Sequence, residues 1–184
     1  MKSRHREKQA IWVSLSVLAV TLIAAHLRAS ASKKPLATVE NLDLERYQGT
    51  WYEIARLPLS WERKCARDVT ANYALQPDGA IAVINTWRKA DGTIARSKGT
   101  ARPASQRGSP AKLRVSFFWP FAGDYWVFDL DPEYRWALVG TPNRKYLWLL
   151  SRTPQLTAQL LDELIEKARA RGFDTRKLIM TQHS

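Results

Sequence analysis

The chain has 184 residues, 45% of them hydrophobic, and a formal net charge of +12. This length and apolar content fit one folded domain with a short extra segment and exclude a disordered chain. A single cysteine and three histidines exclude a disulfide scaffold and a zinc–cysteine cluster, and they disfavour catalysis by a histidine base. No catalytic residue, metal site or cofactor is therefore predicted.

The first 31 residues have the organisation of an export signal. Basic residues precede an apolar run over residues 10–25, and Ala29-Ser30-Ala31 follows as a small-residue cleavage site. As a helix the run would rise about 24 Å at about 1.5 Å per residue, which is less than a hydrocarbon core of about 30 Å. Residues 1–31 are predicted to be a cleaved signal peptide. The alternative is an uncleaved inner-membrane anchor formed by residues 10–25.

Residues 32–40 hold two lysines and a proline, and they are predicted to be a mobile linker before a domain over residues 41–184. The leader contains five basic residues and Glu7, so the chain beyond it keeps a net charge of +8. Such a charge favours anionic surfaces such as phospholipid headgroups. A nucleic-acid partner is not expected, because an export signal directs the chain away from nucleic acid.

After the linker the apolar pattern changes to a period of two. Strand-like segments recur about every ten residues, separated by turns rich in Gly, Pro and Asp. They cover residues 50–57, 69–75, 80–87, 93–102, 112–118, 125–130, 134–139 and 145–151. Eight short strands in hairpin order predict an antiparallel up-and-down β-barrel, because closure removes the unpaired edge strands.

One helix is predicted after the last of these strands. Leucines recur at helical spacing from Leu156 to Leu164, Thr157 suits the N-terminal cap, and Gly172 suits the stop. The apolar stripe of this helix is expected to pack against the outside of the barrel. A short strand over residues 177–181 would then return to the sheet.

Alternation within the strands predicts which side chains face the barrel interior. Along residues 112–118 the inward set is Leu113, Val115 and Phe117, and Tyr73 belongs to a matching set on an earlier strand. The interior of an eight-stranded barrel is either filled by side chains or holds one small ligand. Periodicity alone does not decide between these alternatives.

Three motifs resemble the signatures of the lipocalin family. The first is Gly49-Thr50-Trp51 at the start of the first strand, the second is the segment 130–139 around Tyr134, and the third is Arg152 after the last barrel strand. They occur in the family's order, and the resemblance covers residues 41–182. Within the family, the chain is most similar to the bacterial outer-membrane (Blc-type) lipocalins, and apolipoprotein D is a more distant relative.

This resemblance implies an all-β fold: an eight-stranded antiparallel up-and-down β-barrel with one C-terminal α-helix packed on its side. It further implies that Trp51 plugs the closed end, that Arg152 lies across its indole, and that the other end opens into a hydrophobic cavity. The implied protein is not an enzyme. It holds a fatty acid or a lysophospholipid, for storage or transport of lipids in maintenance of the bacterial envelope.

The resemblance also implies an exported protein of the periplasm, associated with the outer membrane. Bacterial relatives are commonly lipoproteins, but this leader offers no cysteine for lipid attachment. The predicted ligand-binding residues combine the inward alternation with positions that match aromatic pocket residues of the family. They are Tyr73, Leu113, Val115, Phe117, Tyr125 and Trp148. The alternative is that these side chains only fill the core.

Four aromatic residues fall within residues 117–122, a stretch that leads into a hairpin. A solvated hairpin tip is normally polar, so Trp119 and Phe121 are predicted to contact a membrane surface or a partner. The alternative is that these rings fold back over the mouth of the barrel. The sequence also leaves a homodimer open.

Two other functions remain as alternatives to lipid binding. One is a barrel with a filled interior that acts as a structural or partner-binding module. The other is an enzyme that uses the thiol of Cys65, which has basic neighbours able to lower its pKa. The position of Cys65 before a strand makes an unpaired thiol without a role the favoured interpretation.

Overall fold

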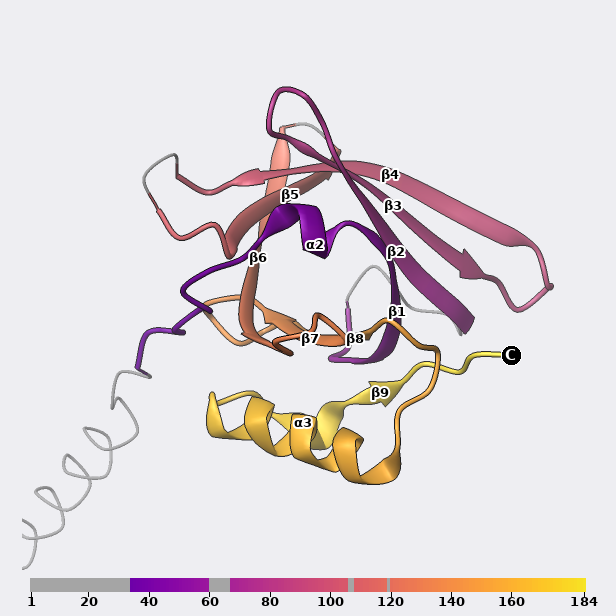
Figure 1. The fold of residues 1–184 in the computed structure, drawn as a ribbon. Helices are drawn as coiled ribbons and strands as arrows, with labels where there is room; N and C mark the ends of the chain where they lie inside the picture. Colours follow the sequence, from indigo (N-terminus) through magenta and orange to yellow (C-terminus); the bar gives the residue numbers. More distant parts are fainter. Residues whose placement is uncertain (1–33, 60–66, 106–107, 119) are drawn as a thin grey trace, which may run out of the picture. The chain divides into compact units, whose positions relative to one another are not determined.

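The computed structural model describes residues 34–59, 67–105, 108–118 and 120–184 (Figure 1). The predicted leader, Cys65 and Trp119 lie outside these ranges. Residues 35–184 form one compact unit, which is the part described below. Within the described ranges, no helix is long and apolar enough to cross a membrane.

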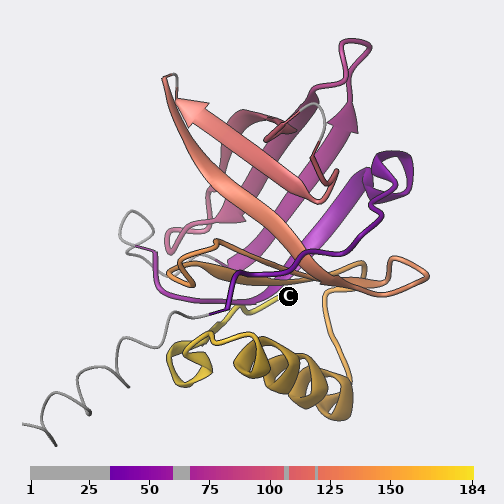
Figure 2. The same ribbon diagram turned by 90° about the vertical axis from the view of Figure 1, so that its left-hand side faces the viewer.

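Residues 49–151 form a closed antiparallel β-barrel (Figure 2). Each strand pairs with the next along the chain, β8 pairs with β1, and β1 pairs back to β2. The eight barrel strands are β1 (Gly49–Arg56), β2 (Arg67–Leu75), β3 (Ile81–Arg88), β4 (Ile94–Pro103), β5 (Lys112–Phe118), β6 (Phe121–Leu130), β7 (Trp136–Gly140) and β8 (Leu147–Ser151). The predicted barrel and its strand order are confirmed.

Strand boundaries differ from the prediction at turns whose backbone leaves the extended region. β7 begins at Trp136 rather than at residue 134, because Tyr134 has a positive φ of 59° within a turn organised by the Asp131 carboxylate. β8 begins at Leu147 rather than at residue 145 because Arg144 adopts the same conformation. β6 instead begins earlier than predicted, at Phe121, because a tight hairpin pairs this residue with Phe118 of β5.

Helix α3 (Ala158–Ala170) packs against the outer face of the barrel, as predicted (Figure 1). Thr157 caps its start by accepting a hydrogen bond from the amide of Leu160. Leu164 and Ala168 are its buried residues, and they belong to a cluster of outward-facing apolar side chains of β1, β7 and β8. After the helix, the Phe173 ring lies against Gly140 of β7. A Cβ atom at Gly140 would come within 2.5 Å of this ring.

The chain then passes through the 3-10 turn η1 (Thr175–Lys177) to β9 (Ile179–Met180), which pairs antiparallel with the end of β1. The predicted return of the chain to the sheet is therefore confirmed. A four-residue helix that the sequence analysis does not predict, α2 (Leu44–Tyr47), precedes β1. The carboxylate of Asp43 caps α2 by accepting from the amides of Glu45 and Arg46.

Part of the predicted mobile linker is packed on the domain. Leu36 is buried in the same outward-facing apolar cluster as Leu164 and Ala168. The amide of Val39 donates to the carbonyl of Val127 at 3.1 Å. Thr38 also shares a hydrogen bond with Ser109, so residues 36–39 are held in place rather than mobile.

The two ends of the barrel differ. β1, β3, β5 and β7 begin at the end where Trp51 is buried, and we call this the closed end. At the opposite end the inward side of β4 becomes accessible to water. Ala101 is fully buried on this inward side, whereas Gly99, Ser97 and Ala95 are half-buried. We call this opposite end the open end.

Candidate functional site

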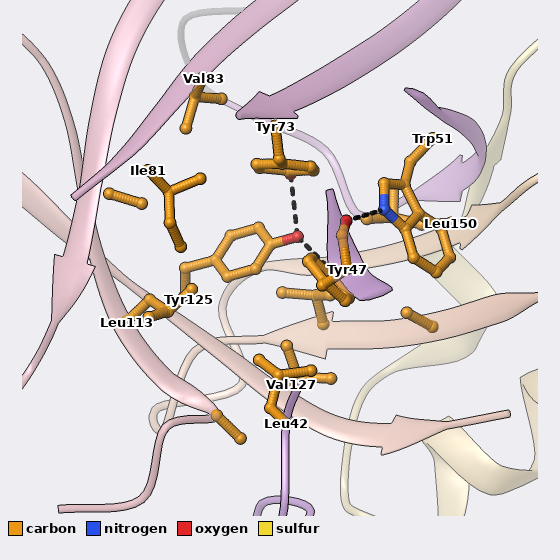
Figure 3. Close-up of a cluster of buried hydrophobic side chains, with 14 residues drawn as sticks. Leu42, Tyr47, Trp51, Tyr73, Ile81, Val83, Leu113, Tyr125, Val127 and Leu150 are labelled. Carbon is orange, nitrogen blue, oxygen red and sulfur yellow. Dashed lines mark hydrogen bonds between the residues drawn. The ribbon is translucent and has the colours of Figure 1, made fainter. Parts of the chain in front are cut away.

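The barrel interior is lined by one continuous apolar cluster (Figure 3). Because directly paired residues of an antiparallel sheet project to the same face, strand register identifies the inward side chains. Leu113 pairs with Tyr125, and Val127 pairs with Val139, and all four belong to this cluster. The interior is therefore a hydrophobic surface built from facing strands.

Three tyrosine hydroxyls form a short hydrogen-bonded chain inside this surface (Figure 3). The Tyr125 hydroxyl lies 2.9 Å from that of Tyr47 and 2.9 Å from that of Tyr73. Burial is the main cause that raises the pKa of Tyr73 to about 12 and the pKa values of Tyr47 and Tyr125 well above the usual value. The three groups therefore stay neutral and protonated near pH 7.

The tyrosine chain has more protons than internal hydrogen bonds. Three hydroxyls carry three protons, and the two hydrogen bonds of the chain use two of them. Within the described residues, the three hydroxyls have no further hydrogen-bond partner. One hydroxyl proton is consequently without an acceptor among the described residues. A buried donor without an acceptor costs about 1–3 kcal/mol, so an oxygen atom in the barrel interior would be stabilised by accepting it.

The closed end is organised around Trp51, and Arg152 lies across its indole as the family resemblance implies. The guanidinium carbon of Arg152 lies 3.9 Å from the centre of the Trp51 ring, and the indole NH donates to the Tyr47 carbonyl at 2.9 Å. Gly49, at φ +87°, lies next to Arg152, where a Cβ atom would approach its guanidinium to 3.5 Å. The Tyr134 hydroxyl accepts from the amide of Asp43, which ties the start of α2 to the β6–β7 turn.

The structure brings most of the predicted ligand-binding residues together. Tyr73, Leu113 and Tyr125 are buried in the interior cluster, while Val115 and Trp148 are partly buried against it. Trp148 stacks on Tyr125 with ring centres 6.4 Å apart. These residues line one surface, and their contact with a ligand stays a prediction.

Phe117 occupies a different position from the other five predicted residues. Its ring packs over Gly99, on the inward side of β4, and 43% of the residue is exposed. It therefore lies toward the open end, outside the buried part of the cluster.

Several inward-facing polar residues are not predicted from the sequence, among them Tyr47, Glu53 and Arg56. Tyr47 comes from α2, which is too short to show helical periodicity. Glu53 and Arg56 lie on β1, where they form a buried ion pair. Alternation from Trp51 could have placed Glu53 inside, but a charged residue in a strand is ordinarily read as exposed.

The β5–β6 hairpin at the open end exposes apolar side chains. Phe118 is 76% exposed and Phe121 is 73% exposed. The alternative that this hairpin folds back over the barrel is therefore wrong for these two rings. Ile94, which begins β4 at the same end, is also exposed.

Comparison with known proteins identifies the class of this barrel. Residues 42–183 match the family model described as a lipocalin-like domain, and the chain belongs to the lipocalin family. The outer membrane lipoprotein Blc of Escherichia coli (strain K12) is 43% identical over 174 residues, covering 91% of this chain and 96% of that protein. Apolipoprotein D of Macaca fascicularis is 35% identical over 150 residues, covering 77% of each chain. The resemblance to both groups is confirmed.

Solved structures agree with this fold. Insecticyanin from the tobacco hornworm superposes with a TM-score of 0.65 at 21% identity, covering 81% of this chain and 85% of that one. Members of the lipocalin family bind small hydrophobic ligands and are not typically enzymes, and this chain belongs to that family.

Proposed function

We propose that this lipocalin holds one fatty acid or lysophospholipid in the open half of its barrel. The observation that carries the proposal is the contrast in exposure along the inward face. Ala101 is fully buried near the closed end, but Ser97 and Asn85, which pair across β3 and β4, are half-buried toward the open end. An apolar interior that is sealed at one end and accessible at the other suits an elongated amphiphile.

The chemistry of the wall favours an acyl chain. Leu113, Val115, Val83 and Val127 offer only hydrocarbon, and the transfer of each methylene from water contributes about 0.8 kcal/mol. Sixteen carbons would supply more than the roughly 8 kcal/mol that micromolar binding needs, even after the cost of ordering the chain. Tyr125 adds a neutral polar contact within reach of the same wall.

A titration with a fluorescent fatty acid tests this proposal. The ligand should quench tryptophan emission and saturate near one equivalent, and no saturable binding below about 100 μM would contradict the proposal. Val115→Phe, which adds volume to the interior, should weaken binding. Its control is Arg114→Phe, because Arg114 is exposed on the same strand and points away from the interior. Equal binding by both variants would mean that the ligand is not held in the interior, which would favour the alternative of a barrel filled by side chains.

We infer in addition that the protein is exported and works in the periplasm, associated with the outer membrane. The organisation of the leader and the name of the Escherichia coli relative, an outer membrane lipoprotein, support this location. N-terminal sequencing of the envelope-associated protein should begin after Ala31. A sequence that begins at Met1 would instead support the uncleaved anchor.

The open end is also proposed to contact a membrane surface. Phe118, Phe121 and Ile94 are exposed there, and aromatic and aliphatic side chains of this kind insert at the boundary between headgroups and acyl chains. The net charge of +8 beyond the leader would attract anionic lipid. A barrel held in this way could exchange a lipid without exposing its chain to water.

A further inference from the structure

The tyrosine chain of Tyr47, Tyr73 and Tyr125 lies deep in the apolar interior (Figure 3). Tyr73 pairs with Gly49 at the start of β1, and Tyr47 precedes β1, so both residues come from the closed end. Tyr125 lies four residues beyond Phe121, where β6 begins at the open end, and this is about 13 Å along the strand at about 3.3 Å per residue. A ligand that enters from the open end would therefore meet these hydroxyls with a part that lies well inside the barrel.

Stability alone gives little reason for three hydroxyls at this place. Only 2% of Tyr47, 5% of Tyr73 and 9% of Tyr125 is exposed. Phenylalanine has the shape of tyrosine without the hydroxyl, and replacing all partners of a buried hydrogen bond by apolar groups of the same shape is often nearly neutral for stability. The tyrosine chain carries a cost that phenylalanine would not have, because one of its protons has no acceptor among the described residues.

The spare proton exists in every arrangement of the tyrosine chain. If Tyr47 and Tyr73 both donate to Tyr125, the Tyr125 hydroxyl keeps its own proton. If Tyr125 donates to one neighbour, the spare proton moves to an end of the tyrosine chain. The three residues therefore offer one hydrogen-bond donor, and its position adjusts by rotation of the hydroxyl groups.

This donor suits an uncharged oxygen better than an anion. Burial is the main cause that raises the pKa of Tyr73 to about 12 and the pKa values of Tyr47 and Tyr125 well above the usual value, so the donor is a neutral hydroxyl. An ionised carboxylate loses its hydration in an apolar interior, and one neutral donor replaces only a small part of that hydration. A hydroxyl or carbonyl oxygen loses much less, and one hydrogen bond offsets the loss.

We propose that the tyrosine chain is a subsite that donates one hydrogen bond to an uncharged oxygen, a hydroxyl or a carbonyl, of the lipid held in the barrel. The inference rests on the proposed function, and it adds a preference for lipids that carry such an oxygen. Two sources of the oxygen fit the subsite. One is a group partway along an acyl chain whose charged end stays at the open end, and the other is an uncharged headgroup that enters the barrel first.

Three ligands with similar carbon chains distinguish these sources. Oleate offers only a charged group at pH 8, because its carboxyl is ionised there. Ricinoleate is oleate with one added hydroxyl in the middle part of its chain, and oleyl alcohol has an uncharged hydroxyl in place of the carboxylate. Dissociation constants are measured for all three, and the readout is the affinity of each hydroxyl-bearing ligand relative to oleate.

The variant Tyr47→Phe/Tyr73→Phe/Tyr125→Phe removes every hydroxyl of the tyrosine chain and keeps the rings. At least one of the two affinity ratios should fall about fivefold or more, the effect of losing one buried hydrogen bond, while oleate binding changes less than about twofold. A fall for ricinoleate alone assigns the oxygen to the acyl chain, and a fall for oleyl alcohol alone assigns it to the headgroup. The control is Tyr52→Phe, which should leave both ratios unchanged because Tyr52 packs against the outward-facing apolar cluster.

Unchanged ratios in the triple variant would overturn the inference and leave the proposed function standing, since water rather than a ligand would then accept the spare proton. An equal loss of affinity for all three ligands would also overturn it, because the hydroxyls would then act only through the shape of the barrel. No binding of any of the three ligands by the unchanged protein would reject the proposed function and the inference together.

A second measurement needs no variant and applies if the triple variant fails to fold. Proton NMR of the unchanged protein observes the buried tyrosine hydroxyls directly. Ricinoleate or oleyl alcohol should shift one hydroxyl resonance downfield relative to the oleate complex, because that proton gains an acceptor. Identical hydroxyl resonances in all three complexes would overturn the inference.

Discussion

The guanidinium of Arg152 lies 3.9 Å from the centre of the buried Trp51 ring. The same guanidinium donates to the carbonyls of Arg46, Thr50 and Tyr134, at 2.8, 2.9 and 3.3 Å. One side chain thereby ties together α2, the start of β1 and the β6–β7 turn while it covers the indole. A cation over an aromatic ring contributes about 0.5 to 2 kcal/mol, and the three hydrogen bonds add to it.

Trp51→Ala should destabilise the protein by about 3 to 5 kcal/mol, because it removes a fully buried indole and leaves Arg152 with no ring beneath it. Urea unfolding followed by circular dichroism measures this loss. Phe118→Ala is the matched control, since Phe118 is a large but exposed aromatic residue and its loss should cost less than about 0.5 kcal/mol. A loss below 1 kcal/mol for Trp51→Ala would show that this residue does not close the barrel.

Gly140→Ala should destabilise the protein by about 1 to 3 kcal/mol, because the new Cβ atom would overlap the Phe173 ring on the outer face of the barrel. Gly123→Ala is the control, since nothing lies within 4 Å of a Cβ atom at that position. Thermal melts of the two variants compare the effects directly. Similar melting temperatures would mean that Phe173 and the segment after α3 do not pack closely on β7.

Alkaline pH should weaken the fold through the tyrosine chain. Tyr73 has a pKa of about 12 in the folded protein, against a usual value of 10.0. Above pH 10 the unfolded chain releases protons that the folded chain retains, so the free energy of unfolding is unaffected below pH 10 and falls as the pH rises toward 12. Urea midpoints from pH 8 to 11.5 measure the fall, and Tyr125→Phe should reduce it.

Absorbance of tyrosinate provides an independent check of the same prediction. The chain has six tyrosines, and Tyr47, Tyr73 and Tyr125 should ionise only at strongly alkaline pH or on unfolding. Ionisation of all six near pH 10 in the folded protein would contradict a buried tyrosine chain.

Binding of the leaderless protein to liposomes should depend on both the hydrophobic hairpin and charge. Sedimentation should require anionic lipid, weaken with salt, and fall when Trp119 and Phe121 are both changed to Ser. Vesicles of phosphatidylcholine alone serve as the control for charge. Equal sedimentation of the double variant, or no sedimentation of either protein, would contradict membrane binding by the hairpin. The hairpin would then be assigned to contact with a protein partner.

Much of the fold could be predicted because its local signals agree. Alternating apolar residues fix β5 as Lys112–Phe118, the predicted bounds, and the capping residue Thr157 fixes the start of α3. The first residues of β6 are not predictable from the sequence, because all four from Phe121 to Asp124 are exposed and carry no alternation. The four residues of α2 are too few for a helical period to show.

The candidate site was predictable where its residues follow the alternation, as Leu113 and Tyr125 do. The inward position of Arg56 is not predictable in this way. Regular alternation from Trp51 and Glu53 would place Arg56 on the outer face, and the register shift after Glu53 returns it to the interior. The hydrogen bonds between Tyr47, Tyr73 and Tyr125 join residues up to 78 positions apart, and only the closed barrel brings them together.

Native mass spectrometry of the purified leaderless protein, after incubation with a small excess of oleate, tests the central claim most directly. A ligand held inside the barrel predicts a single population with one bound oleate, and Val115→Phe should lose that adduct while Arg114→Phe keeps it. Only ligand-free protein, or a ladder of several weakly bound oleates that both variants share, would contradict an acyl-binding interior.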